Sequence, residues 1–190
     1  MSLVAKKERY YTYKDYYAWD DDCRWELIDG VPYAMAPAPS LGHQSILVEL
    51  ARQLGTFLQG KRCKLFIAPC DVRLNADAED DTVVQPDLLV VCDKSKLEDG
   101  KSVVGVPDLI IEILSPSNTK HDKLTKLNLY KRFGVPEYWI VDPDTATVTV
   151  NTLWQETGYS SQVYDKRSTA VPVEVLDGCT IDLANVFDAV

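Results

Sequence analysis

The sequence lacks long apolar runs. No hydrophobic stretch in its 190 residues approaches the ~20 residues that a membrane-spanning helix needs, so we expect no membrane span. The opening stretch, MSLVAKKERYYTYKDYYAWDDD, is charged and aromatic and has no apolar centre of the kind found in a secretory signal peptide. These two absences predict a cytoplasmic protein.

Paired cysteine motifs are also missing. The cysteines are odd in number and scattered, and no two of them form a C-x-x-C pair; they are Cys23, Cys63, Cys70, Cys92 and Cys179. A structural zinc site or a disulfide framework usually needs regular spacing and, for disulfides, an oxidising compartment. The sequence therefore predicts free thiols, without zinc and without a disulfide.

An excess of positive charge is the third absence. The chain has 20 Lys and Arg residues against 29 Asp and Glu residues, a formal net charge of -9. Proteins that coat nucleic acid non-specifically are usually basic, because neutralisation of phosphates by Lys and Arg drives that binding. This chain would need a local basic patch or bound cations to meet DNA.

The residues that are present predict one mixed α/β domain over residues 1–190. The hydrophobic content of 46% suits a globular core, and no repeat or linker interrupts the chain. We expect a core over about 24–143 and a β extension over 144–190. The expected elements are, in order, a hairpin (24–37), a helix (40–60), three strands (63–74, 84–92, 107–114), a helix (117–134), a strand (136–143) and two or three antiparallel strands (145–187).

Two similar stretches carry acidic residues in apolar surroundings. VVQPDLLVVC places Asp87 at the start of one expected strand, and PDLIIEILSPSN places Glu112 inside the next. Asp87 could simply start a strand and face solvent. An ionised Glu112 in a dry setting costs several kcal/mol unless it is paired, so it predicts a salt bridge, an edge position or a functional site.

The two acids together predict a metal site. Two carboxylates about 4 Å apart repel by roughly 4 kcal/mol at an effective dielectric near 20, and a divalent cation between them reverses the sign. Oxygen ligands of this kind suit Mg²⁺ or Mn²⁺, which commonly take one or two carboxylates, waters and a substrate phosphate. We therefore expect Asp87 and Glu112 to bind Mg²⁺ or Mn²⁺.

This pattern resembles the PD-(D/E)xK nuclease superfamily, and within it a bacterial family of restriction-endonuclease-like proteins. The resemblance spans about residues 10–150 and is carried by WELIDG, GHQ, VVQPDLLVV, DLIIEILSPSN, DKLTKLNLY and GVPEYWIVDP. It implies a restriction-endonuclease-like mixed sheet flanked by helices, with extra N- and C-terminal β-strands. It also implies a Mg- or Mn-dependent endonuclease that hydrolyses DNA and forms a homodimer, because two nicks need two sites.

The sequence departs from the superfamily pattern at one position. The lysine expected two residues after Glu112 is replaced by Leu114. The resemblance implies that the following helix supplies the lysine, and Lys126 matches the K-L-x-x-Y part of the family's pattern. Lys123 and Lys131 are alternatives from the same helix. Asn118 or Thr119 could cap this helix, and we expect Leu124 to face the sheet beside Lys126. All three lysines could instead lie on a solvated helix face, which is the usual place of lysine.

Two further residues are accessory candidates. Glu26, in WELIDG, could add a carboxylate to the site, although a glutamate in a hairpin is usually solvated. His43 stands in the first turn of the expected helix 40–60, where the electropositive helix end suits a phosphate or water, or only a capping role.

Two other functions compete with the nuclease hypothesis. The first is a catalytically inactive nuclease-like module that binds nucleic acid or protein, which the acidic charge and Leu114 favour. The second is a metal-dependent hydrolase of another phosphorylated substrate. One fold hosts many functions, so the side chains of the site have to decide between them.

Overall fold

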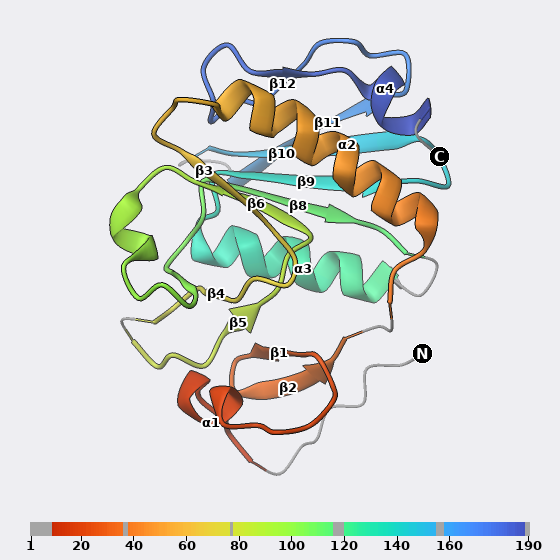
Figure 1. Ribbon diagram of the computed structural model, residues 1–190. Helices are drawn as coiled ribbons and strands as arrows, with labels where there is room; N and C mark the ends of the chain where they lie inside the picture. The colour runs from red at the N-terminus through yellow and green to blue at the C-terminus, as the bar shows by residue number, and fades with distance from the viewer. Residues whose placement is uncertain (1–8, 36–37, 77, 116–119, 155–157, 189–190) are drawn as a thin grey trace.

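The computed structural model describes residues 9–35, 38–76, 78–115, 120–154 and 158–188. Its main sheet has six strands in the order β11-β10-β9-β8-β6-β3 (Figure 1). The bounds of these strands are β3 Lys64–Ile67, β6 Leu88–Val91, β8 Leu109–Ile113, β9 Glu137–Asp142, β10 Thr147–Trp154 and β11 Gly158–Asp165. The strands β6 and β8 are antiparallel neighbours, and β8 is parallel to β9, so the mixed sheet expected from the sequence is confirmed.

Helices cover both faces of this sheet. The helix α2, Leu41–Leu58, lies on one face and α3, Lys120–Phe133, on the other (Figure 1). The hydroxyl of Ser40 caps α2 by accepting a hydrogen bond of 3.2 Å from the backbone N–H of His43. The cap expected for α3, Asn118 or Thr119, lies outside the described residues.

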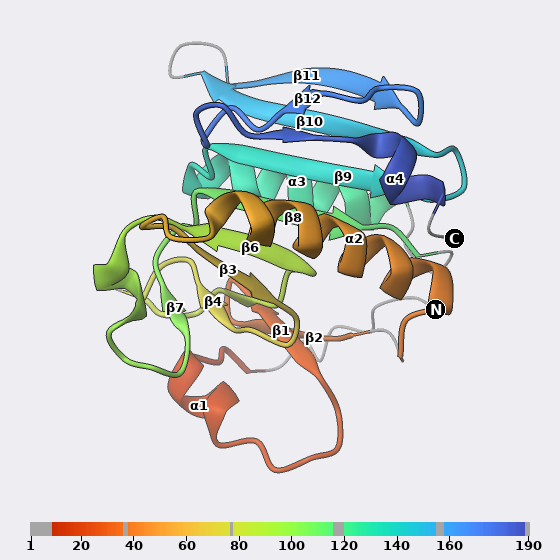
Figure 2. The same ribbon diagram turned by 45° about the horizontal axis from the view of Figure 1, so that its top comes forward.

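Alternation along the strands divides the core in two. In β8, Leu109, Ile111 and Ile113 pack into the cluster under α2, while Ile110 packs into the cluster under α3. The first cluster is closed by the C-terminal elements β12 (Val171–Pro172), β13 (Thr180–Ile181) and α4 (Leu183–Asp188), which lie on the same face as α2 (Figure 2). Every second side chain of a central strand therefore points toward α3.

A second, smaller sheet lies beside α3 and holds the N-terminal segment. Its order is β2-β1-β5-β4-β7. Its strands, with the short helices of this region, are β1 Trp25–Ile28, β2 Val31–Ala34, β4 Val72–Arg73, β5 Val83–Val84, β7 Val103–Val104, α1 Tyr13–Tyr17 and η1 Lys94–Leu97. The expected hairpin is present, and its turn residues Asp29 and Gly30 have φ of 50° and 73°, the left-handed conformation that a two-residue Asp-Gly turn requires.

Three expectations about elements need correction. The expected strand 84–92 is divided between β5 and β6, which lie in different sheets, because Pro86 interrupts it. The expected strand 63–74 is likewise divided into β3 and β4, with Pro69 between them. The tail contains a helix, α4, that the sequence analysis assigned to the β extension.

The cysteine prediction was wrong for one pair. Cys63 and Cys92 form a disulfide, while Cys23, Cys70 and Cys179 are free. The pairing follows from strand register: Lys64 lies opposite Val91, so the residues just outside this pair, Cys63 and Cys92, also lie opposite each other. None of the described helices is long and apolar enough to cross a membrane.

Candidate active site

The register of two neighbouring strands brings the two central acids together. Leu88 of β6 lies opposite Ile111 of β8 in an antiparallel pair. Continuing this register by one residue sets Asp87 opposite Glu112. Side chains directly opposite in antiparallel strands stand on the same face with Cβ atoms roughly 5 Å apart. The sequence stretches that looked alike therefore form the two sides of one site.

The strand alternation explains why Glu112 is tolerated. Its neighbours Ile111 and Ile113 point into the apolar core under α2, whereas Glu112 points toward α3. There it meets polar groups of that helix. The hydroxyl of Tyr130 donates a hydrogen bond of 2.7 Å to Glu112 Oε1, and Lys126 Nζ lies 3.3 Å from the same oxygen. The carboxylate is thus placed in a polar gap between the sheet and the helix.

Lys126 joins two carboxylates. Its ammonium group forms ion pairs with Glu112 and with Glu26 of β1. It lies one helical turn from Tyr130, so both side chains share the face of α3 that meets the sheet. The ring of Tyr130 packs edge-on against Tyr138 of β9 with centroids 4.8 Å apart, which fixes the hydroxyl that faces Glu112.

Glu26 ties the N-terminal hairpin to the site. Its Oε1 accepts a hydrogen bond of 3.0 Å from the backbone N–H of Gln85, two residues before Asp87. The side chain is only 11% exposed, although a glutamate in a hairpin is usually solvated. The reason is that β1 pairs with β5, which leads directly into the segment carrying Asp87.

Asp87 is held by a backbone group and by a histidine. Its Oδ2 accepts a hydrogen bond of 2.8 Å from the N–H of Ile113 and lies 3.3 Å from His43 Nε2. His43 comes from the first turn of α2 and is 7% exposed. Its Nδ1 is buried without a hydrogen-bond partner among the described residues.

The cluster carries an excess of negative charge in a site that is largely shielded from solvent. Burial raises the pKa of Glu112 to about 7; the charge of Lys126 opposes this rise, and Asp87 and Glu26 add to it. Burial disfavours the charged form of Lys126, but Glu112 and Glu26 more than offset this and raise its pKa. Burial also acts against protonation of His43, and Asp87 outweighs it, so the pKa of His43 is raised.

The other predicted lysine lies elsewhere. Lys123 Nζ is 3.8 Å from a carboxylate oxygen of Asp142, at the end of β9, and it does not contact Glu112 in the described structure. We had also expected Leu124 to face the sheet beside Lys126, and this was wrong, because Leu124 is 59% exposed. Leu114, where the superfamily pattern has lysine, is a buried apolar residue.

Some residues of the site were not predicted. The sequence analysis did not assign a role to Tyr130, although its spacing from Lys126 in KLNLY is the signal that could have found it. The contributions of Gln85 and Ile113 are made by backbone N–H groups, which no side-chain pattern reveals.

The donor set suits a hard divalent cation. Its oxygens belong to Asp87, Glu112 and Glu26, and carboxylate oxygen is the ligand that Mg²⁺ and Mn²⁺ prefer. In the described part of the chain, no three His, Cys, Asp or Glu side chains form a ready-made metal cluster. Mg²⁺ does not need one, since it is commonly bound by one or two carboxylates with waters and substrate phosphates.

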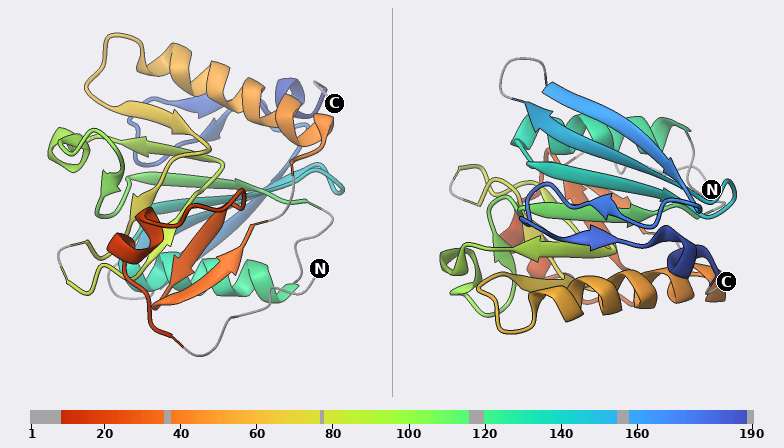
Figure 3. Two further views of the ribbon diagram at one scale, coloured as in Figure 1. Left: turned by 60° about the horizontal axis from the view of Figure 1, so that its bottom comes forward. Right: turned by 90° about the horizontal axis from the view of Figure 1, so that it is seen from above.

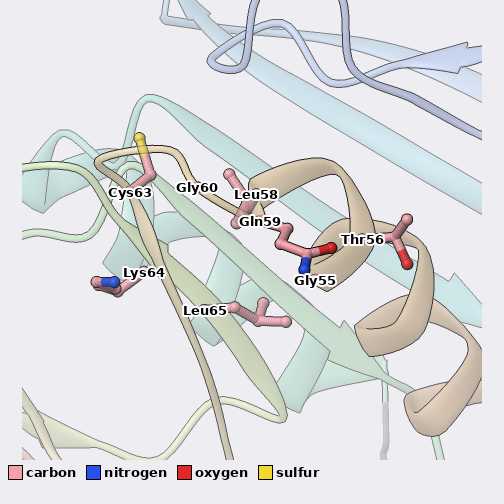
Figure 4. Close-up of a pocket in the computed structure, with 8 residues that line it drawn as sticks. All are labelled: Gly55, Thr56, Leu58, Gln59, Gly60, Cys63, Lys64 and Leu65. Atoms are coloured by element: carbon pink, nitrogen blue, oxygen red, sulfur yellow. The ribbon is translucent and has the colours of Figure 1, made fainter.

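A hollow of about 420 Å³ lies away from this cluster. Figure 4 shows it at the C-terminal end of α2, where its lining consists of Gly55, Thr56, Leu58, Gln59, Gly60, Cys63, Lys64 and Leu65. Its lining has one charged side chain, Lys64, and no carboxylate. The chemistry-bearing residues therefore gather between β6, β8 and α3 and not in this hollow.

The fold and this cluster define a nuclease-like protein of the restriction-endonuclease-like class. The chain belongs to the Uma2 family, described as "Putative restriction endonuclease", which it matches over residues 13–184. Its fold is similar to a crystal structure described as "a putative nuclease belonging to DUF820" from Anabaena variabilis ATCC 29413, with a TM-score of 0.74 and 21% identity, covering 94% of this chain and 98% of that one.

Two relatives come from Synechocystis sp. (strain ATCC 27184 / PCC 6803 / Kazusa). The uncharacterized protein sll1609 is 30% identical over 119 residues, which are 62% of this chain and 65% of that protein. The uncharacterized protein slr1290 is 31% identical over 121 residues, 62% of this chain and 60% of that protein. The matches therefore span less than two thirds of these curated relatives.

Proposed function

We propose that this protein is a Mg²⁺- or Mn²⁺-dependent phosphodiesterase that cleaves DNA. The observation that carries the proposal is the meeting of Asp87 and Glu112 across β6 and β8, with Lys126 brought from α3 to the same place. The family provides the nuclease class, and the residues of the site would supply the metal binding and the charge stabilisation that such a reaction needs.

Asp87 and Glu112 would hold the cation. When bound, a divalent cation of this kind activates water and offsets negative charge on a phosphodiester. His43 and the N–H of Ile113 hold Asp87 through Oδ2, and Tyr130 orients Glu112 through Oε1. These contacts keep both carboxylates fixed in direction, so the ligands need little reorganisation to accept the cation.

Lys126 would stabilise the negative charge that develops on the phosphate. Its two carboxylate neighbours keep the amine protonated, because they raise its pKa. A fixed ammonium group in a sheltered site stabilises a developing oxyanion more strongly than a solvated one does. Lys126 thereby supplies, from a helix, the charge that the superfamily pattern places at position 114. Glu26 serves as the second anchor of this lysine.

The test combines metal binding with cleavage. Calorimetry with Mn²⁺ should show binding in the wild type and in Glu98→Gln, a control on the exposed end of η1, and none in Asp87→Ala. Nicking of a supercoiled plasmid should follow the same pattern. Equal Mn²⁺ affinity in Asp87→Ala and the wild type would refute the metal site.

The same assay separates the competing functions. A wild type that binds DNA but nicks no plasmid with either metal would be the inactive binding module, which the net charge of -9 and Leu114 favour. Hydrolysis of a generic phosphodiester without DNA cleavage would indicate another phosphorylated substrate. We also propose a cytoplasmic location and a homodimer, and fractionation and sedimentation test these two.

A further inference from the structure

One edge of the main sheet is unusually open. The strand β11 has eight residues and, within the described part of the chain, pairs only with β10. Its four central residues, Ser160 to Val163, are exposed, and Val163 is 64% exposed. The strand forms the margin of the molecule (Figure 3, right). The backbone groups on its outer side are therefore available to another extended strand.

The opposite edge of the same sheet is protected. The strand β3 has only four residues, begins with the charged Lys64, and is followed closely by Pro69, which has no N–H to donate. The disulfide between Cys63 and Cys92 ties it to β6. Short length, an edge lysine and proline are the devices by which proteins prevent edge pairing. In contrast, GYSSQVY at 158–164 contains no charge and no proline.

A second copy of this chain fits the open edge. Two copies of β11 related by a twofold axis perpendicular to the sheet run antiparallel, and this axis keeps corresponding faces on the same side. Asp165 and Tyr159 stand on one face because they are six residues apart in a strand. That face is the α3 side, since the hydroxyl of Tyr159 donates to the carbonyl of Val135, just after α3.

Charges at the two ends of β11 complement each other in this arrangement. Lys131 of α3 reaches the start of the strand: a Cβ on Gly158 would lie 2.6 Å from its Nζ. The twofold axis brings Asp165 at the end of one strand toward the start of the other, where the partner's Lys131 stands on the same face. Asp165 also pairs with Arg167 of its own chain; the Arg167 side chain is 85% exposed and can rearrange, and that of Asp165 is 40% exposed.

We propose that β11 is a self-association edge that joins two copies into one continuous sheet. Each protomer keeps its own complete carboxylate–lysine cluster, because β11 lies three strands from β8. The contact is formed mainly by one strand per protomer, so we expect a moderate affinity with a Kd on the order of micromolar. The proposal does not depend on nuclease activity.

Sedimentation equilibrium tests it with two matched valines. Val163 on β11 and Val48 on α2 are both 64% exposed, so a lysine at either position costs little in the monomer. The wild type and Val48→Lys should form dimers with equal Kd, whereas Val163→Lys should weaken the dimer at least 10-fold, because it sets like charges near the axis. A wild type that stays monomeric at about 100 μM, or an unchanged Kd in Val163→Lys, would overturn the proposal.

A charge exchange provides a second, independent readout. Lys131→Asp and Asp165→Lys should each weaken the dimer several-fold, and the double variant should restore it, because the complementary pair is then re-formed in the opposite sense. A double variant weaker than both single variants would show that these residues do not face each other.

Discussion

Two glutamates with little exposure to solvent, one partly and one fully buried, stand on adjacent parallel strands and face opposite ways. Glu112 of β8 points toward α3, whereas Glu137 of β9 lies opposite Leu109 and points toward the α2 side. Glu137 is fully buried, and each of its oxygens accepts one hydrogen bond from a neutral donor: 2.6 Å from the indole N–H of Trp139 and 2.9 Å from the N–H of Val175. Its burial raises its pKa.

Glu112 has a different kind of surroundings. It lies near the ammonium group of Lys126, the phenol of Tyr130 and two further carboxylates. The ammonium and the phenol favour its charged form, and the carboxylates disfavour it. Glu137 accepts its hydrogen bonds from Trp139 of β9 and from Val175 of the C-terminal segment, and it forms no ion pair with any residue that the structure describes. Burial alone therefore does not mark a functional acid. An acid that is shielded from solvent and grouped with like charges indicates a functional site. One whose oxygens all accept hydrogen bonds from neutral donors stabilises the fold.

The largest difference between the two glutamates is expected when each is replaced by glutamine. Glu112→Gln should lower the affinity for Mn²⁺ at least 100-fold, because it removes one of the two charged ligands that we propose. Glu137→Gln should leave the affinity unchanged but lower the free energy of unfolding by about 1–3 kcal/mol, since its amide N–H₂ would face an N–H donor. Calorimetry and urea unfolding measure the two effects. If Glu137→Gln lost Mn²⁺ affinity and Glu112→Gln lost only stability, Glu137 and not Glu112 would be the functional acid.

The next largest effect is expected from removing the ammonium group of Lys126, which lies beside Glu112. Lys126→Met should reduce DNA nicking about 100-fold, the scale for losing one preorganised charge stabiliser, with the protein still folded. Lys123→Met is the matched control, since Lys123 pairs with Asp142 at the end of β9 and not with Glu112 in the described structure, and it should keep its activity. Loss of activity in Lys123→Met alone would transfer the role to Lys123.

The pH dependence sharpens the contrast further. Because the pKa of Glu112 is about 7, a proton competes with the metal, and the affinity for Mn²⁺ should fall roughly 10-fold per pH unit below 7. Glu112→Gln should flatten this dependence. The raised pKa also means that Glu112 contributes stability that is complete below pH 4.5 and is lost as the pH rises through 7. Calorimetry from pH 5.5 to 8 checks the first effect, and a pH-independent affinity would contradict it.

The smallest expected effect comes from one hydroxyl. Tyr130→Phe removes the donor to Glu112 Oε1, which raises the pKa of Glu112 and should weaken Mn²⁺ binding at pH 7 by less than 10-fold. The pH midpoint of Mn²⁺ binding should move upward in this variant. A downward shift would show that Tyr130 does not stabilise the charged carboxylate.

Local patterns predicted the frame of the protein well. The helical periodicity of residues 40–60 located α2, and the repeated Pro-Asp and apolar stretches located the neighbouring β6 and β8. The position of Leu124 could not be obtained in this way, because α3 places Lys126 toward the sheet beside apolar residues such as Leu129 and leaves Leu124 in solvent. A prediction from helical periodicity assumes that apolar residues face the core and charged residues face solvent.

Long-range features escaped the sequence analysis for a common reason. The disulfide depends on the register of β3 against β6, and cysteine spacing contains no information about that register. Glu26 enters the cluster because β1 pairs with β5, and only its place in a family-like motif hinted at this. Glu137 looked like an ordinary strand start in PEYWIVDP, and its two donors became visible only in the folded chain.

The distance in sequence between Glu26 and Lys126 has a consequence for the newly made chain. The two residues are separated by 100 positions, and Glu26 leaves the ribosome first. At about 5–20 residues per second, Lys126 follows roughly 5–20 seconds later. During that interval the nascent polypeptide carries one half of an ion pair without the other. The cluster is therefore a late product of synthesis, and a truncated chain released before residue 126 lacks the ammonium group that joins Glu26 to Glu112.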